Sequence, residues 1–256
     1  MSATKDSRNF LKASRWEDWI RLERDQAKGL PAPPLQKPWP SLPLEQANAL
    51  LIELPPIDQL PFGQLSLKEA IAQRRSHRKY SAEPFSLDEV AFLLWATQGV
   101  QEVSRDGTSS LRTAPSGGAR HTFESYLLLN NVDGLDPGLY RYLPLDHQLG
   151  LVYTDSDLPG KVADACAGQK FIQNAAAVFI WTTIPYRMEW RYGRLAYRII
   201  AMDAGHVCQN LYLAAETMGA GACAIAAYHQ EQLDALLGVD GENEFTIYVA
   251  SVGKIA

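Results

Sequence analysis

The sequence predicts an α+β domain, and three observations support this fold class. The chain has 256 residues, of which 46% are hydrophobic, enough for one large domain with a substantial core. Strand-like and helix-like segments follow one another without the regular βαβ alternation that predicts a doubly wound parallel sheet. The longest helical stretch, 194–218, is apolar around most of its circumference, which is typical of a helix buried inside a domain or a dimer.

Composition argues against several classes of protein. The net charge of -5 and the pI near 5.6 are unlike the basic surface of a nucleic-acid binder. The longest apolar run, Ala175 to Trp181, is strand-sized, and the N-terminus has no signal-peptide pattern. Three widely spaced cysteines and five scattered histidines predict neither a disulfide framework nor a metal site. We therefore expect a soluble cytoplasmic protein with an organic cofactor and no metal.

Residues 1–62 differ from the rest of the chain. The segment 15–28 is strongly charged with apolar residues on one side, which predicts a short amphipathic helix. Nine of the fifteen prolines fall in 31–61, which excludes a regular helix or a central strand there. Apolar residues between these prolines indicate a packed arm rather than a free linker. We expect the arm to lie over a core domain, 63–256, and across a dimer, with these residues buried: Trp16, Trp19, Trp39 and the leucines near Leu50.

From Gly63 onward the secondary-structure pattern is regular. Capping boxes at Ser66 and Ser86 predict helices over 66–75 and 86–98, the second ending at Gly99. The polar segment 101–110 predicts a loop. The remaining expected elements are strands at 124–130, 176–183, 222–227 and 245–252, a hairpin from 138–145 and 148–153, and helices at 158–167, 194–218 and 230–237.

A glycine motif near the C-terminus invites a dinucleotide-binding interpretation. The segment Gly219 to Ala224 matches a loose G-x-G-x-x-A pattern, and Asp240 follows downstream. Its glycines end a helix and lead into a strand, whereas the dinucleotide fingerprint follows a strand and opens a helix. We therefore interpret Gly219 as a helix C-cap and predict no Rossmann site.

The segment Arg74 to Tyr80 carries the strongest chemical signal. It places three arginines, a lysine, a histidine and two hydroxyl groups where a predicted helix ends. Guanidinium groups beside a hydroxyl suit a phosphate, which accepts bidentate, charge-assisted hydrogen bonds. The alternative is a solvated basic helix end, which the helix dipole favours.

Three other segments have both a functional and a structural interpretation. The run Thr113 to Arg120 contains Pro-Ser-Gly-Gly, whose backbone can approach a flat ligand closely, or is an ordinary loop. The basic and aromatic run 186–198 is a substrate lid or the solvated end of a helix. Polar residues of the long helix, His206, Gln209 and Asn210, either bond to a neighbouring helix or contact a ligand.

Taken in chain order, and closed by Gly253-Lys254, these motifs resemble the FMN-dependent nitroreductase superfamily. More narrowly, they resemble the SagB-type dehydrogenases, the thiazole/oxazole-forming oxidases of peptide natural-product pathways. The resemblance covers about 63–256 and leaves the arm outside. It implies a nitroreductase-like fold, with a mixed, mostly antiparallel sheet flanked by helices. It also implies a homodimer with the long helix and two FMN molecules at the subunit interface.

The resemblance also implies roles for individual residues. Four residues are expected to hold the phosphate, ribityl chain and pyrimidine edge of FMN: Arg74, Arg75, Ser76 and Arg78. Lys254 is expected to add a second charge at the phosphate. Those expected at the isoalloxazine ring are Pro115, Ser116 and Gly117, from the other subunit, and the backbone of Ala226 and Ala227 near N5. Gln209 completes the set of cofactor-binding candidates.

The sequence departs from the SagB-type pattern just before the long helix. That branch tends to carry a Lys-Tyr pair, and this chain has Arg191-Tyr192. Because a guanidinium does not lose its proton in proteins, Arg191 is excluded as a base. Tyr192 would take that role if Arg191 stabilised its phenolate. A second departure is the Ala226-Ala227 pair, where glycine is common in the family.

Three functions follow from the resemblance. The first is an FMN-dependent dehydrogenase that oxidises a peptide- or amino-acid-derived azoline to a thiazole or oxazole, with hydride transfer to flavin N5 and O2 as reoxidant. The second is an NAD(P)H-dependent nitroreductase or quinone reductase. The third is a non-catalytic flavin-fold partner subunit. We expect the first, acting on a small-molecule or peptide substrate alongside peptide-modifying partner enzymes.

Overall fold

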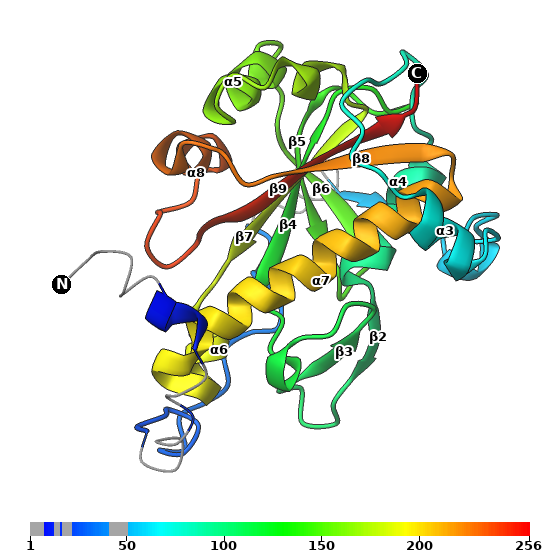
Figure 1. Ribbon diagram of the computed structural model, residues 1–256. Helices are drawn as coiled ribbons and strands as arrows, with labels where there is room; N and C mark the ends of the chain where they lie inside the picture. The colour runs from blue at the N-terminus through cyan, green and yellow to red at the C-terminus, as the bar shows by residue number, and fades with distance from the viewer. Residues whose placement is uncertain (1–7, 13–15, 17–21, 41–50) are drawn as a thin grey trace.

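A seven-stranded antiparallel sheet forms the centre of the fold (Figure 1). The structure is a computed structural model that describes residues 8–12, 16, 22–40 and 51–256. The strands lie in the order β1-β6-β5-β4-β7-β9-β8, and each neighbouring pair is antiparallel. Their bounds are β1 Leu51–Glu53, β4 Phe123–Leu129, β5 Gly138–Leu143, β6 Gln148–Tyr153, β7 Ala177–Thr183, β8 Ala220–Ile225 and β9 Phe245–Lys254. The predicted α+β class and the mostly antiparallel sheet are confirmed.

Helices begin and end largely where local signals predict. Their bounds are α3 Leu67–Gln73, α4 Leu87–Gln98, α5 Leu158–Ala165, α6 Tyr186–Tyr192, α7 Ala196–Thr217 and α8 Gln230–Leu237. Both capping boxes form, with Ser66 capping α3 and Ser86 capping α4. Gly219 follows α7 with a φ of 68°, which confirms its interpretation as the glycine that ends this helix. None of the helices in the described ranges is long and apolar enough to cross a membrane.

Helices cover both faces of the sheet. Figure 1 shows α7 running across one face, where its apolar side packs with α4 against alternate strand residues such as Leu127 and Phe179. The intervening residues, such as Leu128 and Ile180, pack on the other face with α5 and α8. Because alternate side chains of a strand point to opposite faces, the central strands are buried on both sides.

Two element predictions need correction. The predicted loop 101–110 is largely a hairpin, in which β2 Val100–Val103 pairs antiparallel with β3 Ser110–Arg112. Strand β2 is mostly exposed, and in β3 the buried residues, Ser110 and Arg112, are polar, so neither strand has the apolar alternation by which a strand is recognised. The long helix also begins two residues later than predicted, because Gly193, with a φ of 49°, separates α6 from it.

The described parts of the arm pack on the core, and 22–28 do not continue the helix predicted over 15–28. Residues 22–30 form a bend and turns, whereas 15 and 17–21 lie outside the described residues. Strand β1 pairs at the sheet edge, consistent with the exclusion of a central strand. The ring of Trp39 packs so closely on Gly150 that a Cβ there would lie 2.2 Å from it. Trp16, predicted to be buried, is 39% exposed; Trp19 and Leu50 lie outside the described residues.

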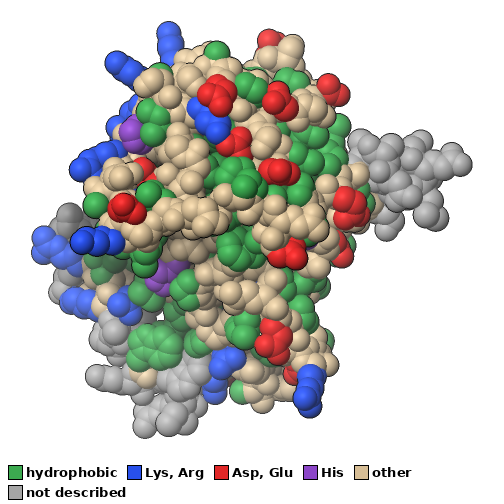
Figure 2. Space-filling model, turned by 90° about the vertical axis from the view of Figure 1, so that its right-hand side faces the viewer, with side chains coloured by type: hydrophobic (Ala, Val, Ile, Leu, Met, Phe, Trp, Pro, Cys, Tyr) green, Lys and Arg blue, Asp and Glu red, His purple; other side chains and the backbone are tan. Residues whose placement is uncertain are grey.

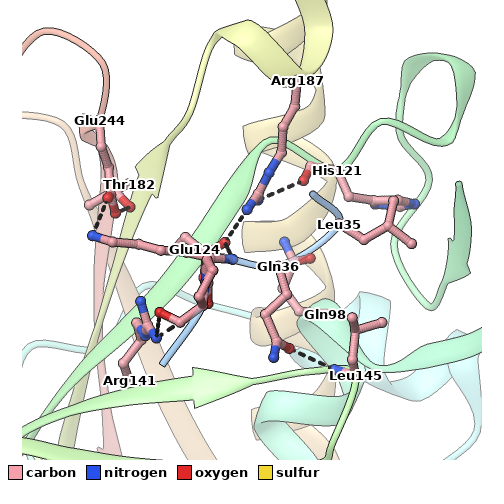
Figure 3. A network of polar contacts seen from close by, with 12 residues as sticks. Leu35, Gln36, Gln98, His121, Glu124, Arg141, Leu145, Thr182, Arg187 and Glu244 are labelled. Atoms are coloured by element: carbon pink, nitrogen blue, oxygen red, sulfur yellow. Dashed lines mark hydrogen bonds and ion pairs between the residues drawn. The ribbon is translucent and has the colours of Figure 1, made fainter. Parts of the chain in front are cut away.

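A buried polar network joins the arm to the sheet (Figure 3). The Glu124 carboxylate accepts hydrogen bonds from Arg187 Nη2 at 2.6 Å and from the backbone N–H of Lys37 at 2.8 Å. The Lys37 ammonium donates to Glu244, whose carboxylate also accepts from Thr182. Arg187 and Glu124 are each only 2% exposed. The interpretation of the run 186–198 as a lid or a solvated helix end is therefore wrong for Arg187, which belongs to the core.

Candidate functional site

Three arginines at the end of α3 form a surface group, called here the cationic cluster: Arg74, Arg75 and Arg78. The Arg74 guanidinium lies 5.3 Å from the centroid of the Tyr212 ring. Arg75 Nη1 donates to backbone carbonyls at the end of its own helix, at 2.8 Å for Arg74 O, so Arg75 also acts as a helix cap. Within the described ranges, none of the three forms an ion pair with a carboxylate. Their charge remains available to an external anion.

Charges are unevenly distributed over the side of the molecule on which α3 lies. Figure 2 shows most Lys and Arg side chains along one margin of this face and most Asp and Glu side chains on the other. The electrostatic potential is therefore positive on one half of this face, which attracts an anion, and negative on the other half, which repels it. The net charge of -5 conceals this separation.

Strand β8 lies directly beside the cationic cluster. The backbone N–H of His77 donates to Ala222 O at 2.9 Å, and Ser76 forms a parallel bridge with the same residue. Ser76 Oγ is hydrogen-bonded to the Tyr212 hydroxyl at 2.9 Å. The same Tyr212 hydroxyl accepts a hydrogen bond from the Ala224 N–H at 2.7 Å. The fold thus joins the end of α3, helix α7 and β8 through the Tyr212 hydroxyl. The exposed pair Ala226-Ala227 follows the end of this strand.

Tyr212 contacts the candidate cofactor-binding residues Ser76 and Arg74, and sequence reasoning missed it. It lies in the apolar pattern of α7 and was not distinguished from a core side chain. The one available signal was that a buried tyrosine hydroxyl usually finds a hydrogen-bond partner. The sequence could not show that this partner would be Ser76 of the predicted phosphate-binding segment.

Lys254 lies at the end of β9, opposite Ala220 of β8. Its ammonium pairs with Glu89 of α4 and lies 4.0 Å from Glu83. It is therefore close to the strand that flanks the cluster, but carboxylates of the chain already balance its charge. Its expected role at the phosphate stays a prediction.

The Pro-Ser-Gly-Gly loop packs against the first half of α7. Gly117 N–H donates to the Asp203 carboxylate at 3.1 Å, and Ser116 Oγ accepts from His121 N–H at 3.0 Å. A Cβ on Gly117 would lie 2.3 Å from Ile199, so this close approach requires glycine. Burial raises the pKa of Asp203 above its ordinary value. A hollow of about 400 Å³ opens beside Pro115 and Ser116.

The candidate catalytic pair contacts the same loop. Arg191 and Tyr192 end α6, and the Arg191 guanidinium lies 5.6 Å from the centroid of the Tyr192 ring. A Cβ on Gly118 would lie 2.5 Å from the Tyr192 hydroxyl and 3.0 Å from Arg191 Cδ. The structure therefore brings the catalytic candidates together with the loop expected to line the flavin ring.

The two groups of candidate residues contact different sides of α7. The loop meets this helix at Asp203, and the cationic cluster meets it at Tyr212, nine residues later. With a rise of 1.5 Å and 3.6 residues per turn, these positions are about 14 Å apart along the axis and on opposite sides. A single chain therefore carries the two halves of the predicted site in different places.

The polar residues of α7 have separate roles. Asn210 Nδ2 donates to Ala96 O at 2.8 Å, so this side chain bonds α7 to α4. His206 and Gln209 are exposed on the helix surface. The exposed Gln209 side chain is accessible to a ligand or a second subunit, and its cofactor-binding role stays a prediction.

Comparison with known proteins places these features in context. The sequence model of the nitroreductase family matches residues 71–254. A nitroreductase-named protein of Methanocaldococcus jannaschii is 30% identical over 207 residues, covering 81% of this chain and 98% of that protein. The trifolitoxin-processing protein TfxB of Rhizobium leguminosarum bv. trifolii is 31% identical over 151 residues, covering 52% of this chain and 38% of that protein. The crystal structure of a nitroreductase-named protein from Ralstonia eutropha JMP134 has a TM-score of 0.66 at 27% identity, covering 89% of this chain and 99% of that chain.

Proposed function

The chain belongs to the nitroreductase family, and from this premise we propose that it is an FMN-dependent oxidoreductase of the SagB-type branch. Its substrate would be an azoline on a peptide or amino-acid derivative, oxidised to a thiazole or oxazole, with O2 as the reoxidant. The similarity to a protein named for processing trifolitoxin supports a peptide pathway with partner enzymes. The alternative is an NAD(P)H-dependent nitroreductase or quinone reductase, which the name of the relative from Methanocaldococcus jannaschii favours.

The observation that carries the FMN assignment is the unpaired cationic cluster. Arg74 and Arg78 have no carboxylate partner among the described residues, and the Ser76 hydroxyl lies between them in the chain. Guanidinium and hydroxyl donors gathered beside β8 fit a phosphate monoester. Bound FMN would supply the hydride acceptor for the oxidation. Arg74, Arg78 and Ser76 would hold its phosphate end, and Ala226-Ala227 would approach its ring.

Tyr192 is the candidate base, and Arg191 is its charge partner. A base must remove one proton from the azoline ring while hydride leaves the adjacent carbon. Arg191 remains a cation, so its contribution is to stabilise negative charge on the phenol oxygen. Both side chains pack against Gly118, next to the loop of Pro115, Ser116 and Gly117. This arrangement would place the proton acceptor beside the ring-lining surface.

We also propose a homodimer in which each site takes residues from both chains. The cluster and the Pro-Ser-Gly-Gly loop lie on opposite sides of α7, so one chain does not bring them together. Large apolar side chains are exposed on α3 and α7: Leu67, Ile71, Tyr197 and Met202. A hollow of about 490 Å³ lies between α3, α4 and α7. Leu67 lines this hollow, and exposed apolar surface of this kind is typical of a protein interface.

Spectroscopy of the purified protein tests the proposed function. We expect a yellow protein whose flavin absorbance is bleached anaerobically by a synthetic thiazoline peptide and recovers on admission of air. NADPH should leave the spectrum unchanged over the same time. Rapid bleaching by NADPH, with no response to the thiazoline, would favour the nitroreductase alternative. A colourless protein with no affinity for added FMN would overturn both and leave a non-catalytic partner subunit.

A further inference from the structure

Helix α6, which carries Arg191 and Tyr192, depends on the N-terminal arm for part of its hydrogen bonding. It has only seven residues, and so short a helix is marginal without outside contacts. Its last carbonyls have no partner within the helix. The backbone N–H of Gln26 donates to one of them, Trp190 O, at 2.9 Å. In return, the Trp190 indole N–H donates to Leu30 O at 3.0 Å.

Further contacts extend along the same helix. The Tyr186 hydroxyl, at its start, donates to Asp25 at 3.1 Å. At its end, a Cβ on Gly193 would lie 3.2 Å from Glu23 O, so the two backbones pack closely. Residues 22–30 therefore contact α6 from its first residue to the glycine that follows it. We call this segment the arm clamp.

Trp16 continues the contact onto the catalytic pair. Its ring lies 6.0 Å from the Tyr192 ring at an interplanar angle of 66°, an edge-to-face arrangement. Trp16 is 39% exposed, so part of its surface remains open beside Tyr192. Both Trp16 and the arm clamp lie outside the matched region, 71–254.

We propose that two described parts of the N-terminal arm belong to the active site: the arm clamp positions α6, and Trp16 forms a wall that selects a planar heterocycle beside Tyr192. The inference rests on the proposed function, because it takes Tyr192 to act on the substrate. The arm clamp and Trp16 are positioning and specificity elements, since they act through α6 and through shape. An indole face suits a flat five-membered ring, on which it can stack.

The arm clamp is tested by a matched pair of substitutions at Gln26, an exposed residue. Gln26→Pro removes the backbone N–H that bonds to Trp190 O, whereas Gln26→Ala keeps it. We expect amide hydrogen exchange in 186–192 to quicken at least tenfold in Gln26→Pro and to stay at the wild-type rate in Gln26→Ala. Exchange in α4 should not change in either. Equal protection of α6 in both variants would overturn the clamp, whether or not the protein binds flavin.

The clamp should also affect turnover more than cofactor binding. A misplacement of about 1 Å at a catalytic group can cost about a hundredfold in rate. We therefore expect Gln26→Pro to lower kcat on the thiazoline peptide at least tenfold while its FMN content stays at the wild-type value. An unchanged kcat, alongside quickened exchange, would show that α6 needs no positioning by the arm.

The wall is tested by titrating flavin-loaded protein with a thiazole carboxamide and recording the flavin difference spectrum. An aromatic contact is worth about 0.5–1.5 kcal/mol, so Trp16→Ala should raise the probe's Kd by up to about tenfold. Trp16→Phe should restore most of the affinity, and Leu11→Ala, at an arm residue 68% exposed, should match wild type. The proposed role of Trp16 would be overturned by an unchanged Kd in Trp16→Ala. It would also be overturned if flavin-loaded wild type did not respond to the probe at millimolar concentration. A wild-type protein without flavin would instead count against the proposed function.

Discussion

Two groups of arginines in this protein differ in what satisfies their hydrogen bonds. The buried group consists of Arg112, Arg120, Arg141 and Arg187, each at most 6% exposed. Every one donates to a carbonyl or carboxylate of the chain, including Leu35 O for Arg112 and Pro38 O for Arg141. The cationic cluster is partly or fully exposed and, among the described residues, has no carboxylate partner.

The difference shows how identical side chains acquire opposite roles. A buried guanidinium without partners is costly, so the fold supplies oxygen atoms to each one and the residue becomes structural. An exposed guanidinium remains solvated without such partners and keeps its donors for a ligand. Substitutions in the buried group should therefore change stability, and substitutions in the cluster should change ligand binding.

The largest effect is expected at the ion pair between Glu124 and Arg187. Glu124→Ala leaves the Arg187 charge buried without its carboxylate, which typically costs about 3–5 kcal/mol. It also removes the acceptor of Lys37 N–H, so the arm should loosen. Urea unfolding followed by circular dichroism should show a much lower midpoint.

A double variant provides the control for this prediction. In Glu124→Leu with Arg187→Met, both charges are removed and similar volume is kept, so most of the stability should return. If the double variant unfolded at the same low urea midpoint as Glu124→Ala, the ion pair would not be what stabilises this region.

His121, a buried histidine near Arg112 of the buried group, should also make the folded protein less stable in acid. Burial and the nearby Arg112 lower the pKa of His121 to about 3, so its imidazole stays neutral in the folded protein. In the unfolded chain its pKa is about 6.5. As pH falls through this window the unfolded state takes up a proton that the folded state does not. The free energy of unfolding should then fall by about 1.4 kcal/mol per pH unit between about pH 6 and pH 4.

His121→Asn isolates this contribution. Asparagine tolerates the positive φ of 44° at this position and does not titrate. The slope of unfolding free energy against pH should differ between wild type and variant by the amount that corresponds to about one bound proton. Parallel slopes over this range would show that His121 is not the titrating group.

The sequence predicted those parts of the fold that depend on local signals. The capping boxes at Ser66 and Ser86 act within four residues, so the starts of α3 and α4 were predicted correctly. Apolar residues in the segments 124–130 and 176–183 likewise predicted β4 and β7. The hairpin 100–112 was missed because its buried residues Ser110 and Arg112 are polar and Leu111 is exposed, so it carries no apolar alternation.

Partners distant in the chain could not be read from the sequence. Arg187 looked like a surface residue of a basic run, and its partner Glu124 lies 63 positions away. Lys37 of the arm bonds to Glu244, 207 positions away. The candidate site shows the same limit, because each group of residues was recognised locally. Only the fold shows that α7 separates the Arg74 segment from the Pro115 loop.

Within the cationic cluster, the comparison predicts lost binding without lost stability. Arg74→Ala or Arg78→Ala removes a charge-assisted hydrogen bond worth about 1.5–3 kcal/mol, so affinity for FMN should fall about 10- to 100-fold. The urea midpoint should stay near wild type, because these arginines have no carboxylate partner among the described residues to lose. Fluorescence quenching of free FMN by apoprotein measures the affinity.

Riboflavin, which lacks the phosphate, is the matched ligand control. It should bind wild type and both variants with similar affinity, because the missing contact is to the phosphate. Lys68→Ala, on the neighbouring α3 surface, should bind FMN like wild type. Full FMN affinity in Arg74→Ala and Arg78→Ala would mean that the cluster is only a solvated helix end.

The smallest effect is expected at Tyr212, a buried residue that contacts the exposed cationic cluster at Arg74. Tyr212→Phe keeps the ring beneath Arg74 but removes the hydroxyl that bonds to Ser76 and accepts from Ala224 N–H. A neutral hydrogen bond contributes about 0.5–1.5 kcal/mol, so FMN affinity should fall by about three- to tenfold. Tyr153→Phe removes a comparable hydroxyl contact, to Leu236 O, away from the cluster, and should leave FMN affinity unchanged. If both variants weakened FMN binding equally, the hydroxyl of Tyr212 would serve general stability and not the position of Ser76.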